Sequence, residues 1–105
     1  MRNQTVRSKH PVHPGLYEVM SNGNRVWVNG PMGESIARIS NLPYPEGTVA
    51  IDIHKPHAEV CATGSECLDC RHDLSGRAAW DHFVASLQQN YGVRVNAKHR
   101  PTWAV

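Results

Sequence analysis

The sequence of 105 residues has no long apolar run and few aromatic residues, which make up 7% of it. No stretch approaches the roughly 18 apolar residues that a membrane-spanning helix needs. The first residues also lack the apolar core of a secretory signal. We therefore expect a protein of the cytoplasm that does not enter a membrane.

Neither sign of charge dominates the chain. Eleven Lys and Arg against nine Asp and Glu give a net charge of +2 with histidine neutral. This excess is too small to indicate the clustered basic surface of a typical nucleic-acid-binding domain. The bases gather towards the two ends, whereas residues 52–81 hold six acids and three bases. We interpret the basic ends as solvated, with weak phosphate contact as the alternative.

The first 15 residues contain two prolines, a glycine and little apolar content, but carry Arg2, Arg7 and Lys9 with no acid. These features are typical of a loosely attached segment. We predict a flexible basic arm over residues 1–15. The remaining residues, 16–105, have a length that suits a single domain.

Strand patterns follow the arm. The runs Leu16–Met20 and Arg25–Asn29 flank Asn22-Gly23, a pair that favours a tight hairpin turn because both residues tolerate positive φ. A second turn at Gly30–Gly33 leads into an alternating run over Glu34–Ser40, and Thr48–Ile53 is a further β-branched run. We predict a small antiparallel meander of three to four strands.

The clearest helix pattern covers Ser75–Tyr91. Its apolar residues recur with helical spacing, and Gly92 can take the left-handed conformation that ends a helix. Such a helix would cover one sheet face and form a two-layer α+β domain, with the other face exposed unless a partner covers it. We also expect Trp103 to fold back onto the domain. The helical stripe consists of Trp80, Phe83, Val84, Leu87 and Tyr91.

Residues 54–74 show no sustained period and contain all three cysteines and three of the seven histidines. An odd number of cysteines excludes a complete disulfide framework within one chain. A zinc ion would clamp this irregular segment, because Cys-x-x-Cys supplies two thiolates and structural zinc takes four ligands. Reduced structural cysteines and redox use of Cys67 and Cys70 are the alternatives. The candidate ligands are Cys61, Cys67, Cys70 and His72, with His54 or His57 as substitutes.

Enzyme signatures are weak. The chain has no Gly-rich phosphate loop, and His54-x-x-His57 lacks the spacing and the adjacent glutamate of a zinc hydrolase. With seven histidines and three cysteines, a nearby Cys–His pair is expected by chance. Trp27 with Arg25 and Arg38 offers a stacking platform on a sheet face, but we expect Trp27 to be a core residue. We expect no catalytic activity.

Several short motifs occur in a fixed order: Tyr17-Glu18-Val19, Val26-Trp27-Val28, Ile36-Ala37-Arg38-Ile39, Ile51-Asp52-Ile53-His54, Glu66-Cys67-x-x-Cys70-x-His72, Trp80-x-x-Phe83 and Tyr91-Gly92-Val93-x-Val95. Over residues 16–103 they resemble small conserved proteins encoded by bacteriophages and prophages. The resemblance implies a small accessory protein in the bacterial cytoplasm that binds a macromolecule, and it carries over no catalytic residue.

These observations together favour non-catalytic binding of a protein partner. The partner would dock on the uncovered sheet face or on the acidic 52–81 segment, and a homodimer would be one way to cover that face. The alternative is a zinc-stabilised nucleic-acid-binding module that uses Cys67, Cys70 and the basic termini.

Overall fold

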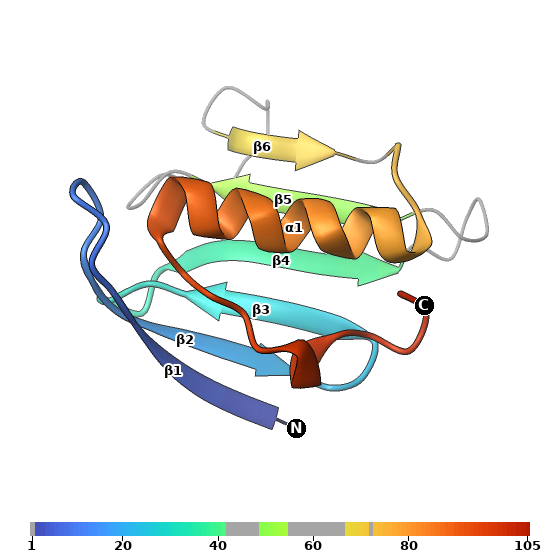
Figure 1. Ribbon diagram of the computed structural model, residues 1–105, viewed down its shortest axis with the longest axis horizontal. Helices are drawn as coiled ribbons and strands as arrows, with labels where there is room; N and C mark the ends of the chain where they lie inside the picture. Colours follow the sequence, from blue (N-terminus) through green and yellow to red (C-terminus); the bar gives the residue numbers. More distant parts are fainter. Residues whose placement is uncertain (1, 42–48, 55–66, 72) are drawn as a thin grey trace.

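A computed structural model describes residues 2–41, 49–54, 67–71 and 73–105, with only the backbone for residues 54 and 67–71. Over these residues the chain forms a six-stranded sheet and one α-helix (Figure 1). The helix is α1 (Gly76–Tyr91), and a short 3₁₀ helix, η1 (Ala97–His99), follows it. The strands are β1 (Arg2–Ser8), β2 (Gly15–Ser21), β3 (Arg25–Asn29), β4 (Ser35–Asn41), β5 (Val49–His54) and β6 (Cys67–Arg71).

The strands lie in sequence order, and each pairs antiparallel with the next. The turn between β2 and β3 contains the predicted Asn-Gly pair: Gly23 has φ 93°, and Asn22 Oδ1 accepts hydrogen bonds from the amides of Asn24 and Arg25. A side-chain acceptor at the first position and a glycine at positive φ are both typical of tight turns. The predicted meander is therefore confirmed and extended at both edges.

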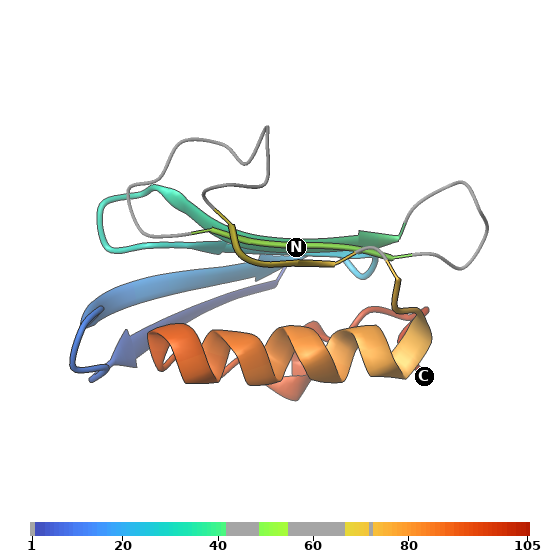
Figure 2. The ribbon, with the colours of Figure 1, turned by 90° about the horizontal axis from the view of Figure 1, so that it is seen from above.

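The helix covers one face of the sheet and contacts β4 and β5 (Figures 1 and 2). Period-2 alternation explains which strand residues face it: Val26 and Val28 are fully buried, whereas Trp27 between them lies on the opposite face. The helical stripe inserts Trp80, Phe83, Leu87 and Tyr91 into the core. The predicted two-layer α+β fold with a C-terminal helix is confirmed.

Both ends of α1 match the sequence pattern. Ser75 occupies the N-cap position without a side-chain cap hydrogen bond, and Gly92 ends the helix at φ 67°. The Gly92 amide donates to the carbonyl of Gln88, which satisfies one of the last helical carbonyls. Arg77 and Asp81 form an exposed ion pair at 3.0 Å.

The predicted flexible arm is wrong for residues 2–8, which form β1 along the edge of the sheet. Only one residue of this strand, Val6, is apolar and faces inwards, so the hydrophobic pattern of the strand is weak. Polar contacts hold the strand in place of apolar packing: Gln4 donates to the Arg94 carbonyl and accepts from the Asn96 amide, and Ser8 Oγ donates to the Tyr91 carbonyl. These bonds satisfy the backbone that leaves the helix, which apolar residues at the same positions would not do.

The strand at the opposite edge of the sheet was not predicted either. Residues 67–71, expected to be irregular, form β6 against β5, so the sheet has six strands among the described residues rather than three or four. The rest of the expected irregular segment, apart from residues 54, 73 and 74, lies outside the described residues.

The residues after α1 return across the sheet and fix its N-terminal strands. Trp103 Nε1 donates to the Asn24 carbonyl at 2.8 Å, and the Thr102 amide donates to the Gly23 carbonyl at 2.9 Å. The expectation that Trp103 folds back is confirmed. No helix in the described part of the chain is long and apolar enough to cross a membrane.

His99 anchors this returning segment. It is 1% exposed, and its Nδ1 lies 2.7 Å from Ser21 Oγ, which is itself buried. Burial lowers the pKa of His99, and the nearby charges of Lys98 and Arg2 lower it further. The folded protein therefore holds this imidazole neutral at a pH where the unfolded chain would bind a proton.

The expected result is a loss of stability in acid. Because the pKa of His99 is lower in the folded than in the unfolded chain, its contribution is complete above about pH 6.5 and falls as the pH drops below that value. One extra proton taken up on unfolding changes the free energy of unfolding by up to about 1.4 kcal/mol per pH unit. Urea unfolding between pH 7.5 and 5 should show a shallower decline in His99→Gln than in the parent. Equal slopes would contradict this assignment.

Candidate functional site

The sheet face opposite the helix carries the aromatic residue that the sequence singled out. Trp27 is half-buried in the middle of this outer face, and its register neighbours are Met20 on β2 and Arg38 on β4. The expectation that Trp27 is a core residue is therefore wrong, because Val26 and Val28 form the core face of β3. A stacking platform requires a partly exposed aromatic ring beside an arginine on a sheet face, and Trp27 has this position next to Arg38.

A shallow hollow of about 260 Å³ lies beside Trp27. The guanidinium of Arg38 forms an ion pair with Asp52 of β5 at 3.1 Å, and this pair forms part of the hollow's lining. Arg25 also lines the hollow, is exposed, and forms no ion pair with any other described residue. Among the described residues, the hollow on the outer face therefore places a large aromatic ring beside Arg25, a positive charge without an ion-pair partner.

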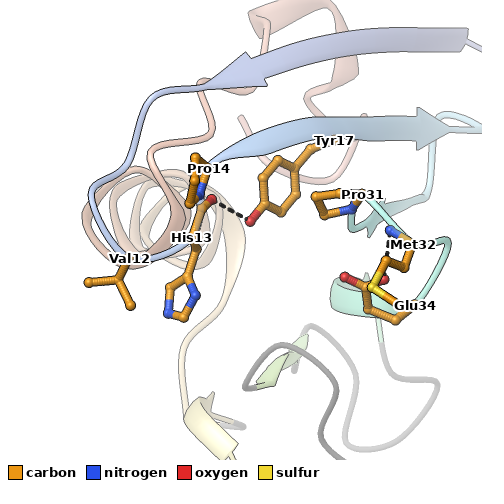
Figure 3. A pocket seen from close by; sticks show the side chains of 7 residues that line it. All are labelled: Val12, His13, Pro14, Tyr17, Pro31, Met32 and Glu34. Atoms are coloured by element: carbon orange, nitrogen blue, oxygen red, sulfur yellow. Dashed lines mark hydrogen bonds between the residues drawn. The ribbon is translucent and has the colours of Figure 1, made fainter.

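A second hollow, of about 380 Å³, lies at one end of the sheet (Figure 3). Its walls come from the β1–β2 connection, which supplies Val12, His13 and Pro14, from Tyr17 of β2, and from the β3–β4 turn. The Tyr17 hydroxyl donates to the His13 carbonyl at 2.8 Å. We call this hollow the sheet-end pocket.

Glu34 lines the sheet-end pocket from the β3–β4 turn and lies across the hollow from His13 in Figure 3. Its Oε2 accepts a hydrogen bond from the Met32 amide at 2.9 Å. Its Oε1 is buried and has no hydrogen-bond partner among the described residues. Buried polar atoms are almost always paired in folded proteins, so Oε1, which lies against Gly30 and not at the solvent surface, is an exception.

Two glycines bring the walls of this pocket together. A Cβ on Gly15 would lie 2.5 Å from Pro31 Cγ, so only glycine lets the start of β2 approach the β3–β4 turn this closely. A Cβ on Gly30 would overlap the Glu34 carboxylate. The absence of a side chain at Gly30 is therefore what allows Glu34 to fold back over its own turn.

The pocket sits against two buried tyrosines whose rings meet edge to face, with centroids 6.0 Å apart. Burial raises the pKa of Tyr17, and the negative charge of Glu34 raises it further. Burial also raises the pKa of Tyr91 beyond its usual range, with smaller contributions from Tyr17 and Glu34. Both hydroxyls therefore stay protonated at physiological pH, and Tyr91 Oη, like Glu34 Oε1, has no partner among the described residues.

Sequence reasoning missed this pocket. The prolines of residues 11–14 and the Gly30–Gly33 turn are visible as turn signals, but their residues come together only through strand pairing across the sheet. The one usable signal was a glutamate directly after a Gly-Pro-Met-Gly turn, where it can reach back to a turn amide.

The predicted zinc ligands are only partly placed. Cys67 and Cys70 lie in β6, where their register partners are His54 and Asp52, and the backbone there is a strand rather than the tight turn of a zinc knuckle. Cys61, His57 and His72 lie outside the described residues. Among the side chains that the structure describes, no group of three His, Cys, Asp or Glu is placed to hold a metal ion. The zinc site stays a prediction.

Known proteins do not assign either hollow a role. The chain matches no protein-family model, no curated protein and no solved structure. The chemistry of the two hollows is therefore the basis for the function.

Proposed function

We propose that the protein is a non-catalytic binding protein of the bacterial cytoplasm, an accessory protein of the phage type, and that its protein partner docks on the outer sheet face. The observation that carries this proposal is the position of Trp27. Its side chain is half-exposed beside a hollow, at the centre of the sheet face that the helix does not cover. Tryptophan and arginine are the residue types that contribute most binding energy in protein interfaces, above all near the interface centre.

The charges of the outer face indicate the chemistry of the partner. The Arg38 charge is largely balanced by Asp52, whereas Arg25 has no such neighbour among the described residues. A partner segment with an apolar side chain for Trp27 and a carboxylate for Arg25 would match both features. The segment we propose is therefore acidic as well as apolar.

The same face is poorly suited to nucleic acid. Single-stranded nucleic acids are bound by a positively charged groove with successive aromatic rings. Among the described residues, Trp27 is the aromatic ring of this face, and Glu18 and Asp52 place negative charge on the same side of the sheet as Arg25 and Arg38. A protein segment fits this mixed surface better.

Replacing Trp27 with alanine is expected to weaken partner binding at least about 30-fold, which corresponds to the loss of a central anchor worth 2 kcal/mol or more. The partner would first be captured from a bacterial lysate with the tagged chain, then purified and titrated calorimetrically. Arg25→Ala should weaken binding as well, whereas the matched variant Arg94→Ala, an exposed arginine after α1, should not.

Unchanged affinity in Trp27→Ala, with unfolding midpoints showing that the variant is folded, would contradict the proposal. Binding to single-stranded DNA or RNA that falls steeply with salt and is lost in Trp27→Ala would favour the nucleic-acid alternative instead.

A further inference from the structure

The basic residues from the two ends of the sequence meet along the β1 edge of the sheet. The segment after α1 lies on the same side of the sheet as the helix (Figure 2) and runs antiparallel to β1. Side chains of β1 donate to its carbonyls in this order: Ser8 to Tyr91, Gln4 to Arg94 and Arg2 to Lys98. The fold therefore joins two segments that are more than 80 positions apart in the sequence.

These two segments carry positive charge only. Residues 2–9 and 92–105 contain six Lys and Arg but no Asp or Glu, because all nine acids lie between residues 18 and 81. Glu18 of β2 lies on the outer face, across the sheet from the segment after α1. The net charge of +2 thus conceals a strong separation of charge. We name the six cations the basic edge: Arg2, Arg7, Lys9, Arg94, Lys98 and Arg100.

The cations of the basic edge are accessible. All six side chains are exposed, and none forms an ion pair with another described residue. Arg2 donates through one nitrogen to the Lys98 carbonyl, and Lys98 Nζ donates to the Asn3 carbonyl at 3.3 Å. A guanidinium has five donors and an ammonium three, so both groups keep donors for a ligand. The charges of Lys98 and Arg2 also lower the pKa of His99, so the local field is positive.

The cations are spread along the strand and do not converge on one pocket. Seven residues of β1 extend over about 20 Å. Arg2 and Lys98 lie at its start, Arg94 lies beside Gln4, and Arg7 is near its end. Phosphates of one strand of a double helix follow each other every 3.4 Å or so along the axis, so an edge of this length faces several of them. An extended polyanion fits this arrangement better than a single phosphate group.

The basic edge offers phosphate contacts without base stacking. Residues 2–9 contain no aromatic residue, and the indole of Trp103 in the other segment donates to the Asn24 carbonyl. Proteins that bind single strands stack the unpaired bases on successive aromatic rings. In a duplex the bases are already stacked, and contacts to the backbone alone are sufficient for binding that does not depend on sequence.

We propose that the basic edge binds the phosphate backbone of a nucleic-acid duplex without reading its sequence. DNA and RNA duplexes share this chemistry and are the two sources to be distinguished. The basic edge and the Trp27 hollow have no residue in common, so this proposal stands independently of the proposed function. It also requires no zinc ion.

The test is a fluorescence-anisotropy titration of the full-length protein against labelled duplexes of about 20 base pairs, at salt concentrations between about 20 and 200 mM. The logarithm of the association constant should fall against the logarithm of salt concentration with a slope between about −3 and −5, as roughly three to five phosphate contacts require. Two duplexes of unrelated sequence should bind equally. Tighter binding of the DNA or of the RNA duplex identifies the source.

Charge-removing variants assign the binding to the basic edge. Arg94→Gln should reduce the magnitude of the slope by about 1 and weaken binding roughly three- to tenfold at 100 mM salt, and Arg94→Gln with Lys98→Gln should reduce it by about 2. The matched control is Arg38→Gln with Arg77→Gln, which removes two exposed arginines that are paired with acids elsewhere. This control and Trp27→Ala should leave duplex binding unchanged.

Four results would overturn the proposal. These are no duplex binding at the lowest salt, the same slope in the parent and in the folded Arg94→Gln/Lys98→Gln variant, an equal loss in the matched control, and tighter binding of single strands or of vesicles with about one-quarter phosphatidylserine than of duplexes. Loss of the protein partner in Trp27→Ala, with duplex binding intact, would separate the two proposals.

Discussion

Replacing Phe83 with alanine is expected to lower the free energy of unfolding by about 3–5 kcal/mol. Phe83 is fully buried in the middle of the α1 stripe, and its ring stacks against Trp80 with centroids 5.9 Å apart. Its loss would leave a cavity between the helix and the strands β4 and β5. For a domain whose total stability is of the order of 5–15 kcal/mol, this change is large.

Urea unfolding followed by circular dichroism measures this effect. The control is Gln89→Ala, an exposed position of the same helix, which should change stability by no more than about 0.5 kcal/mol. A loss in Phe83→Ala as small as that in the control would show that α1 does not pack on the sheet in the way described.

The second large effect is expected for Gly92→Ala, at about 2–5 kcal/mol. An alanine at φ 67° adopts a left-handed conformation that costs about 1–2 kcal/mol. Its Cβ would also lie 2.8 Å from Ser8 Oγ and 3.2 Å from His10 Cβ, and overpacking of this kind costs about 1–3 kcal/mol. The collision arises only because β1 and the residues after it pack against the end of the helix.

Gly76→Ala provides a matched control for this prediction. Gly76 has a similar φ of 57°, but a Cβ there would meet nothing within 4 Å. The control therefore measures the backbone cost alone, and the difference between the two variants measures the contact with β1. Equal losses in the two variants would indicate that residues 2–8 do not hold the position described, as the predicted flexible arm requires.

The elements that were predicted from sequence are those that build the core. The β2–β3 hairpin and α1 carry apolar residues with a clear period, because one face of each is buried. The edge strands were missed for a physical reason. In β1 the inward positions Gln4 and Ser8 are polar and bind the backbone at the end of α1 and just after it, so their role depends on residues more than 80 positions away.

The Trp27 face and the sheet-end pocket also differ in how far the sequence predicts them. Local alternation separates Trp27 from Val26 and Val28, but the sequence favoured a core position for Trp27, and the structure shows that the core face of β3 is the one with the two valines. The sheet-end pocket could not, because Tyr17, His13 and Glu34 belong to three separate elements. Sequence reasoning also could not foresee that the Met32 amide binds one oxygen of Glu34.

Site-directed photocross-linking reports directly whether a protein partner docks on the outer sheet face. A photoreactive p-benzoylphenylalanine in place of Ser40 would lie at the edge of the Trp27 hollow, and one in place of Gln89 would lie on the exposed side of α1. We expect a cross-link to a separate acidic protein from position 40, absent when Trp27→Ala is added, and none from position 89. Cross-linking from position 89 alone, or from position 40 only to a second copy of this chain, would contradict it.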